Sequence, residues 1–178
     1  MIDKERKVEA KKNFDNFLRE GLIIKRKDEL AKIKYLENAE LSLKVANELL
    51  ESINKPYLWI IVISYYAMFY SANAVLLNLG YKTQDKIVHK VTNEALIVLV
   101  LEKLKKELIE DYEIIKEDAM EIASIKAESL IEDYESELGK RSQFQYNMLE
   151  ETKEAKAKTS IKRANEFVFE MKKLLSLS

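Results

Sequence analysis

A polar stretch from Gly139 to Asn147 carries the side chains best suited to bind a phosphate group. Cations, amides, hydroxyls and two aromatic rings follow one another there, in the order Gly139-Lys140-Arg141-Ser142-Gln143-Phe144-Gln145-Tyr146-Asn147. A guanidinium donates hydrogen bonds in a fork that matches phosphate oxygens, so Arg141 is a candidate phosphate ligand. The alternative is structural, because an arginine in a polar loop often only caps a helix or pairs with an acidic neighbour.

His89 is the single histidine of the chain and the second candidate. It falls in the first turn of a helix expected to begin near Lys86. The positive end of that helix and the adjacent Lys90 both favour the neutral imidazole, so we expect a lowered pKa. A neutral imidazole could serve in binding RNA or a nucleotide, whereas a lone histidine at such a place is also commonly structural.

The composition excludes several classes of site. The three glycines, Gly21, Gly80 and Gly139, lie far apart, which excludes a glycine-rich phosphate loop and a dinucleotide-binding fingerprint. Without cysteine and with one histidine, the chain has neither thiolate zinc sites nor the Glu-x-x-His pairs of carboxylate di-metal sites. Acidic residues along 110–121 are more simply an exposed helix face than a metal site. We therefore expect no metal and no cofactor.

The candidate residues must be positioned by helices. The 178 residues are about one domain long, and three glycines with one proline leave few breaks for a sheet protein. Apolar residues spaced by three and four predict helices over 3–20, 28–53, 56–79, 86–108, 111–138, and from Met148 or Thr152 to Leu175. The stretches 86–108 and 111–138 can form one bent helix or two.

These elements predict an all-α fold, an antiparallel up-and-down bundle of four main helices plus an N-terminal helix. Residues 1–27 would form the N-terminal helix and a basic connection, and residues 28–178 the bundle. Gly21 is a plausible helix stop, and Asp28 can cap the next helix. The apolar spacing points a set of side chains inward that includes Val8, Phe14, Phe17, Leu18, Leu30, Ile33 and Ile53.

The central helix raises the question of a membrane span. Pro56–Tyr81 has no charged residue over 26 positions, long enough to cross a bilayer. Serines, tyrosines and asparagines inside it suit a buried helix of a soluble protein better, so we expect no membrane association. The N-terminus is charged throughout and lacks the apolar core of a signal peptide. Together with the absence of cysteine, this favours a cytoplasmic location.

Charge is unevenly distributed although the net charge is −1. Residues 101–138 carry 13 acidic and 5 basic residues, whereas residues 139–178 carry 9 basic and 5 acidic ones. The first 34 residues carry 11 basic and 7 acidic ones. Such faces are usually only solvated, but positive ends are also the footprint of nucleic-acid binding.

One motif resembles a known family. The centre of the apolar helix reads Ser64-Tyr65-Tyr66-Ala67-Met68-Phe69-Tyr70-Ser71-Ala72, and Leu79-Gly80-Tyr81 and His89-Lys90 follow it. This pattern resembles the HEPN domain (higher eukaryotes and prokaryotes nucleotide-binding), in particular an archaeal and bacterial branch with a tyrosine-tyrosine-alanine-methionine-phenylalanine helix. The segment from Arg141 to Tyr146 and the run Ala164-Asn165-Glu166-Phe167-Val168 match that branch too, so the resemblance covers about residues 28–175.

The resemblance implies a bundle of four or five helices that often dimerises. Many HEPN members are metal-independent endoribonucleases, frequently toxins paired with a minimal nucleotidyltransferase antitoxin. Their active motif is an arginine, usually followed by a polar residue, and then a histidine a few positions later. Arg141 and Ser142 match the first two positions, and two protomers would bring their motifs together in one cleft.

The histidine of that motif does not carry over, because Tyr146 stands five positions after Arg141. The resemblance therefore leaves Arg141 and Tyr146 as the candidate catalytic residues. RNA cleavage needs a base for the 2′-hydroxyl proton and an acid for the leaving oxygen, and tyrosine, with a pKa of about 10, is a poor base. Arg141 could still stabilise phosphate charge. Two readings therefore remain: an RNA- or nucleotide-binding domain, or a non-catalytic homodimeric module that partners a nucleotidyltransferase.

Overall fold

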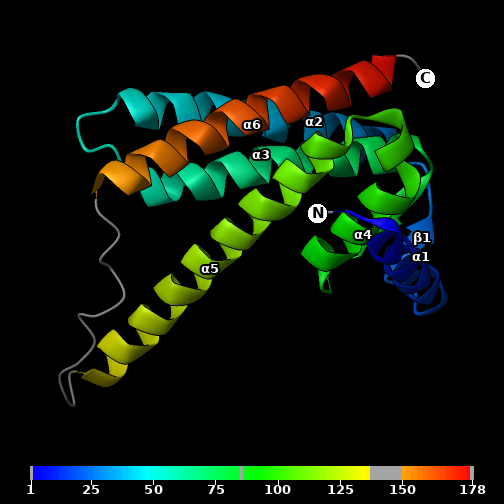
Figure 1. The fold of residues 1–178 in the computed structure, drawn as a ribbon, viewed down its shortest axis with the longest axis horizontal. Coiled ribbons are helices and arrows are strands. Elements are labelled where there is room, and N and C mark those ends of the chain that lie inside the picture. The colour runs from blue at the N-terminus through cyan, green and yellow to red at the C-terminus, as the bar shows by residue number, and fades with distance from the viewer. Residues whose placement is uncertain (1, 85, 137–149, 177–178) are drawn as a thin grey trace.

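The computed structural model describes residues 2–84, 86–136 and 150–176, with the side chains of all but 124–136, 150 and 151. Within these residues six α-helices form an all-α bundle with one small sheet (Figure 1). In chain order the elements are α1 (Lys4–Arg19), β1 (Ile23–Lys25), α2 (Glu29–Glu51), α3 (Tyr57–Asn78), β2 (Tyr81–Thr83), α4 (Val88–Leu99), the 3-10 turn η1 (Leu101–Lys103), α5 (Lys106–Ser136) and α6 (Glu150–Ser176).

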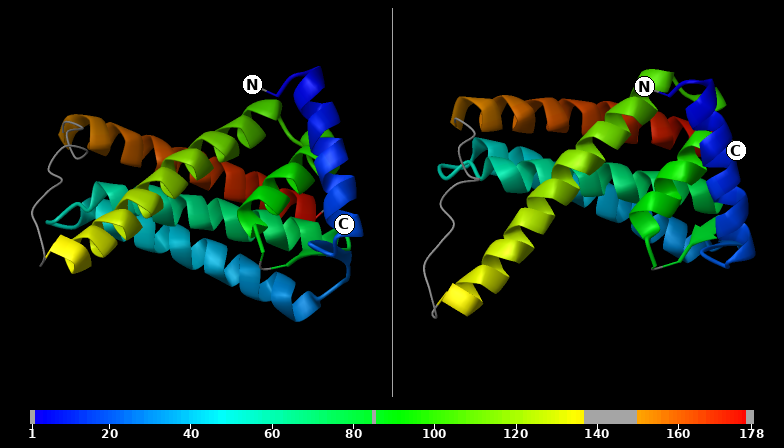
Figure 2. Two further views of the ribbon diagram at one scale, coloured as in Figure 1. Left: turned by 90° about the horizontal axis from the view of Figure 1, so that it is seen from below. Right: turned by 60° about the horizontal axis from the view of Figure 1, so that its bottom comes forward.

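Helix α3 is the centre of the bundle. Helices α2 and α6 lie along it, α5 crosses it at an angle, and α4 and α1 close one end (Figures 1 and 2). The four long helices α2, α3, α5 and α6 alternate in direction along the chain, which confirms the predicted helical bundle. The later part of α5 diverges from α3 and α6 in Figure 1 and in the right-hand view of Figure 2.

Helix α3 begins directly after Pro56 and is followed by Gly80, whose φ of +86° suits a residue without a Cβ. Among the described helices α3 is long and apolar enough to cross a membrane by length and composition. However, 83% of its most apolar window is buried inside the structure. Tyr65, Met68 and Leu76 are among its fully buried side chains, so α3 has the burial of a core helix.

The division between α4 and α5 lies earlier than the sequence predicts. Helix α4 ends at Leu99, η1 follows, and Leu104 is extended before α5 begins at Lys106. The predicted boundary near residues 108–111 is therefore wrong, and the two stretches are separate helices. Periodicity cannot detect this break, because Leu101, Leu104 and Leu108 keep a helical spacing straight through it.

A two-stranded antiparallel sheet closes the end of α3. Strand β1 pairs with β2 in the register Ile23 to Thr83, Ile24 to Lys82 and Lys25 to Tyr81. Two segments that the sequence presents only as connections thus pair across more than 50 residues. Gly21, at φ +69°, provides the turn between α1 and β1 and confirms the predicted helix stop.

Several side chains predicted to point inward are exposed instead. Phe14 and Phe17 of α1 are buried as expected, but Val8 is 65% exposed. On α2, Asp28 caps the helix as predicted by accepting from the Ala31 backbone N–H at 3.1 Å. Leu30, Ile33 and Ile53 are nevertheless exposed. Leu30 and Ile33 lie in the first turns of α2 and Ile53 lies beyond its end, so apolar spacing alone does not show which of its side chains are covered.

Candidate functional site

The polar segment predicted to bind phosphate lies outside the described part of the chain. Arg141, Lys140, Ser142 and Tyr146 all fall within residues 137–149. Their predicted roles therefore stay predictions. The candidate site that the structure does describe is built around His89.

His89 lies where α3, α4 and α5 meet. It is the second residue of α4 and is partly buried. Its Nδ1 is 2.7 Å from the hydroxyl oxygen of Tyr65, a fully buried residue in the middle of α3. That distance is short for a hydrogen bond between a hydroxyl and a ring nitrogen. The tyrosine-rich motif and the single histidine, 24 positions apart in the sequence, thus form one unit.

Aromatic rings fix the orientation of the imidazole. The ring centroid of Phe69 lies 4.7 Å from that of His89, and the centroids of Tyr65 and Tyr66 lie 5.5 and 6.0 Å away. All three aromatic residues come from consecutive turns of α3. The histidine side chain is therefore held by one hydrogen bond and three ring contacts, rather than projecting freely from α4.

The predicted lowering of the His89 pKa is confirmed, but its causes differ from those expected. Burial lowers the pKa first, because it disfavours the charged imidazolium, and the positive charge of Lys116 lowers it further. Lys116 belongs to α5, so the sequence neighbour Lys90 is not the cation responsible. The imidazole is accordingly neutral near pH 7.

A second tyrosine extends the hydrogen-bonded group into the core. The hydroxyl oxygen of Tyr112, on α5, lies 3.5 Å from that of Tyr65. Tyr112 is fully buried, and its ring stacks on Phe167 of α6 with centroids 5.4 Å apart. Burial raises the pKa of both tyrosines, so both hydroxyls stay protonated. The chain Tyr112–Tyr65–His89 therefore runs from the core to the surface.

The start of α4 is held in place by a buried polar group on α3. Asn73 donates from Nδ2 to the Phe69 carbonyl at 2.9 Å and to Thr92 Oγ1 at 3.2 Å. Its Oδ1 accepts a hydrogen bond from Thr83 Oγ1 at 2.7 Å. Thr83 lies on β2 and Thr92 on α4, so one asparagine joins both elements that flank His89 to α3.

An ion-pair network covers the other side of α4. Arg6 of α1 donates from both terminal nitrogens to the two carboxylate oxygens of Glu94, each at 2.8 Å, and also to Glu113 of α5 at 3.2 Å. Asn93 donates to the same Glu113 oxygen at 2.9 Å. Glu94 is 4% exposed, so this fork anchors α1 to the helix that carries His89.

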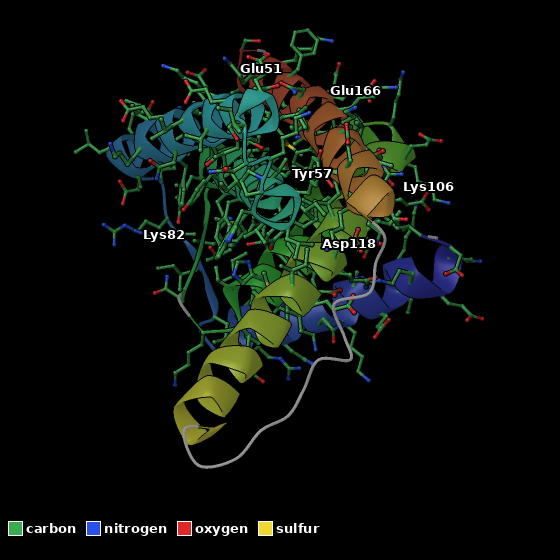
Figure 3. All side chains as sticks on the ribbon, turned by 90° about the vertical axis from the view of Figure 1, so that its left-hand side faces the viewer. Glu51, Tyr57, Lys82, Lys106, Asp118 and Glu166 are labelled. Carbon is green, nitrogen blue, oxygen red and sulfur yellow. The ribbon has the colours of Figure 1, made fainter. Side chains whose placement is uncertain are left out.

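A further junction lies at the opposite end of α3. Tyr57 donates to Glu154 of α6 at 2.8 Å, and Lys156 of α6 donates to Asp118 of α5 at 3.0 Å. Figure 3 labels Tyr57 and Asp118 on this side of the bundle. A shallow hollow of about 250 Å³ opens beside it, lined by residues 54–59 and Lys153.

The described residues contain no group of three or more acidic or histidine side chains placed to hold a metal ion.

The sequence singled out His89 but missed its partners. Tyr65 was visible only as part of a family motif, and Tyr112 only as one member of an apolar stripe. Lys116 carried no signal at all, because nothing in the sequence shows that α5 folds back onto the start of α4. Tertiary packing alone assembles this group.

The comparisons with known proteins agree with the geometry. The model of the HEPN domain family matches residues 34–174, which include α3, His89 and the segment from Arg141 to Tyr146. Searches among curated proteins and among solved structures found no match. Because the family model covers most of the chain, the chain belongs to the HEPN domain family.

Proposed function

We propose that this chain is a cytoplasmic RNA-binding domain, a degenerate member of the metal-independent endoribonucleases of its family. Arg141, Lys140 and Ser142 would contact the phosphate backbone, and His89 would present its imidazole to the same ligand. Tyr146 stands where the cleaving members carry a histidine, so RNA binding is expected to be stronger than any RNA cleavage.

The observation that carries this proposal is the environment of His89. A neutral imidazole, partly exposed and fixed by Tyr65, feels the positive charge of Lys116 within the part of the chain that matches the family. HEPN domains are generally associated with ribonuclease or nucleotide-binding activity. A phosphate can bind where a hydrogen-bond donor and a positive charge act together. This favours a binding role for His89 over a purely structural one.

The chemistry at Tyr146 limits the expected cleavage. A base must take the 2′-hydroxyl proton and an acid must protonate the leaving oxygen. An ordinary tyrosine is protonated near neutral pH, so it cannot serve efficiently as that base. Arg141 can still stabilise the charge on the phosphate, which is enough for binding.

RNA binding can be tested by fluorescence anisotropy with labelled single-stranded RNA at several salt concentrations. Affinity should fall as salt rises, and Arg141→Ala should weaken binding and reduce the salt slope by roughly 0.7, the value for one phosphate that is no longer neutralised. Lys44→Ala is the matched control, because this lysine on α2 is 73% exposed and far in sequence from both candidate sites. It should bind as the wild type does.

Two results would contradict the proposal. One is wild-type protein that binds no RNA at low salt. The other is Arg141→Ala protein that binds RNA with the wild-type affinity and salt slope, because binding would then not use the family motif.

A second candidate function rests on a different observation, the exposed apolar surface. Trp59 is 53% exposed and Ile114 44% exposed, and α5 diverges from the bundle (Figure 2). HEPN domains often dimerise. The chain could thus be a non-catalytic homodimer that partners a minimal nucleotidyltransferase, as in toxin–antitoxin pairs.

Co-expression separates the two candidates. A non-catalytic partner should co-purify with a nucleotidyltransferase encoded beside it, and Arg141→Ala should leave that complex and any growth phenotype unchanged. An RNA-acting toxin should instead slow growth when expressed alone, and Arg141→Ala should relieve the effect. Mass spectrometry of the complex after incubation with ATP would also detect a nucleotide transferred to Tyr146.

A further inference from the structure

We propose that His89 donates a hydrogen bond from Nε2 to a phosphate oxygen of RNA, and that Tyr65 and Tyr112 fix the tautomer which makes this possible. Lys116, whose positive charge acts on the imidazole, would supply the second interaction with the phosphate. This inference rests on the proposed RNA-binding function and names the atoms that would carry it out at the described site.

The direction of the hydrogen-bond chain follows from the count of protons. Tyr112 is fully buried, and its only hydrogen-bond partner among the described residues is the Tyr65 hydroxyl. We infer that its proton points to Tyr65 across the long 3.5 Å contact, because only then does each hydroxyl proton have an acceptor: Tyr65 donates its own proton to His89 Nδ1 at 2.7 Å. A neutral imidazole that accepts at Nδ1 carries its proton on Nε2.

The donor atom is available to a ligand. Among the described residues, the buried side-chain atoms that lack a hydrogen-bond partner are Ser64 Oγ and Asn93 Oδ1. A buried Nε2 without a partner would belong with them, and His89 Nε2 does not. It makes no hydrogen bond to a described residue either, so Nε2 is not fully buried and its proton has no partner among these residues. The surrounding rings of Phe69 and Tyr66 restrict the imidazole to one orientation.

Lys116 is the cation whose charge acts on the imidazole. It lies one helical turn after Tyr112 on α5, and residues four apart share one face of a helix. Its charge acts on His89, and within the described part of the chain it forms no ion pair. The acidic residues Glu94 and Glu113 nearby are both paired with Arg6. A neutral donor and an unpaired cation together suit one phosphate group.

The tautomer can be read directly, because the chain has a single histidine. Long-range ¹H–¹⁵N spectra of the purified protein should show the proton on Nε2 and a non-protonated Nδ1 at pH 7.5. Tyr65→Phe removes the donor and should give a mixture of both tautomers. Tyr66→Phe is the matched control, since Tyr66 touches the imidazole only with its ring and should leave the spectrum unchanged.

Ligand binding is then followed at the same nitrogen. Single-stranded RNA should shift the Nε2–H signal of the wild type. Inorganic phosphate and AMP are added separately at equal phosphate concentration. A shift with one of them but not with RNA would identify a free phosphate or a nucleotide as the ligand. Tyr65→Phe and Lys116→Gln should each weaken RNA binding roughly 3- to 10-fold, the expected effect of removing one hydrogen bond or one charge interaction. Lys116→Arg should bind as the wild type does.

The outcomes separate this inference from the proposed function. RNA binding that leaves the Nε2–H signal unmoved overturns the inference and the contact of His89 with RNA, but leaves RNA binding through Arg141, Lys140 and Ser142 standing. A wild-type imidazole protonated on Nδ1 overturns the inference whatever RNA does. Wild-type protein that binds no RNA overturns both, and a shift with phosphate or AMP but not with RNA replaces RNA by a smaller ligand and overturns the inference as stated.

Discussion

His89 links the candidate site to the stability of the whole domain. Its pKa in the folded protein is lowered by burial and by Lys116, while in the unfolded chain it returns to the ordinary value of about 6.5. Near and below that value the unfolded chain therefore binds more protons than the folded one. By linkage, the contribution of His89 to stability is fully present above about pH 7 and is lost as the pH falls.

We therefore expect the free energy of unfolding of the wild type to fall between pH 7.5 and pH 5.5. His89→Asn, which cannot titrate, should show a smaller fall over the same range, although it is less stable at pH 7.5 because asparagine has no ring to pack against the aromatic residues. Urea unfolding at three pH values measures both. Ordinary carboxylates change their protonation mostly below this window. Parallel pH curves for the two proteins would show that the folded pKa is not lowered.

At the scale of elements, the strongest single anchor is the fork between α1 and α4. Arg6→Ala leaves Glu94 buried without a partner, which we expect to destabilise the domain by about 3 kcal/mol. Lys7→Ala, at an exposed position of the same helix, should change stability by less than about 0.5 kcal/mol. Urea unfolding at pH 7.5 compares them.

A double variant tests the cause of that loss. Arg6→Ala with Glu94→Gln removes the uncompensated charge and should recover part of the stability that Arg6→Ala loses. Equal stability of Arg6→Ala and Lys7→Ala would mean that α1 is held by its apolar residues alone, such as Phe14 and Phe17.

The junction of α3 with β2 makes a second test at this scale. Thr83→Val keeps the shape of the side chain but removes the donor to Asn73 Oδ1, whose other neighbour, Thr92, is a distant 3.5 Å away. We expect a loss of about 1–2 kcal/mol in the free energy of unfolding, since a buried acceptor is left poorly satisfied. Thr159→Val, exposed on α6, is the control and should be nearly neutral. A loss equal to that of the control would mean that the hydrogen bond from Thr83 to Asn73 does not stabilise the junction of β2 with α3.

These elements also show how far the sequence predicts the fold. Helix existence and the caps at Gly21 and Asp28 follow from local chemistry, which acts within a few residues and is visible in the chain. The pairing of β1 with β2 and the break after Leu99 are not visible. Each depends on residues far apart in the sequence, and helical spacing of leucines runs through the break without change.

The same distinction holds at the site. His89 could be selected as the only histidine, and the direction of its pKa shift was predicted, although from the helix terminus and Lys90 rather than from burial and Lys116, which cause it. The cation that acts on it, Lys116, and the tyrosine that binds it, Tyr65, are brought there only by the crossing of α5 and α4 over α3. Functional groups assembled by packing of distant helices carry no local signature.

At the scale of the whole molecule, an aromatic stripe on α3 remains partly uncovered. Trp59, Ile63, Tyr66 and Tyr70 follow at spacings of four, three and four, so they share one face, and Trp59 is 53% exposed. Tyr66 also contacts His89, so the α3 stripe adjoins the candidate site. A second copy of the chain that covered this stripe would bring two such sites together.

The proposed homodimer therefore has a specific expected interface. Light scattering after gel filtration should give twice the monomer mass of 20.8 kDa. Trp59→Lys places a charge in the α3 stripe and should shift the protein towards monomer, by roughly tenfold or more in the dissociation constant, because central aromatic residues dominate interface energies. Leu30→Lys is the matched control, since Leu30 is 82% exposed on α2, outside the α3 stripe, and this variant should remain dimeric.

Trp59 is also the only tryptophan, so it reports on its own burial. If the α3 stripe is the interface, its fluorescence should shift to shorter wavelength and become less accessible to acrylamide as the protein concentration rises through the dissociation constant. Leu30→Lys should show the same concentration dependence. A dimer whose Trp59 emission does not change with concentration must associate through another surface, and the two His89 sites would then lie apart and act independently.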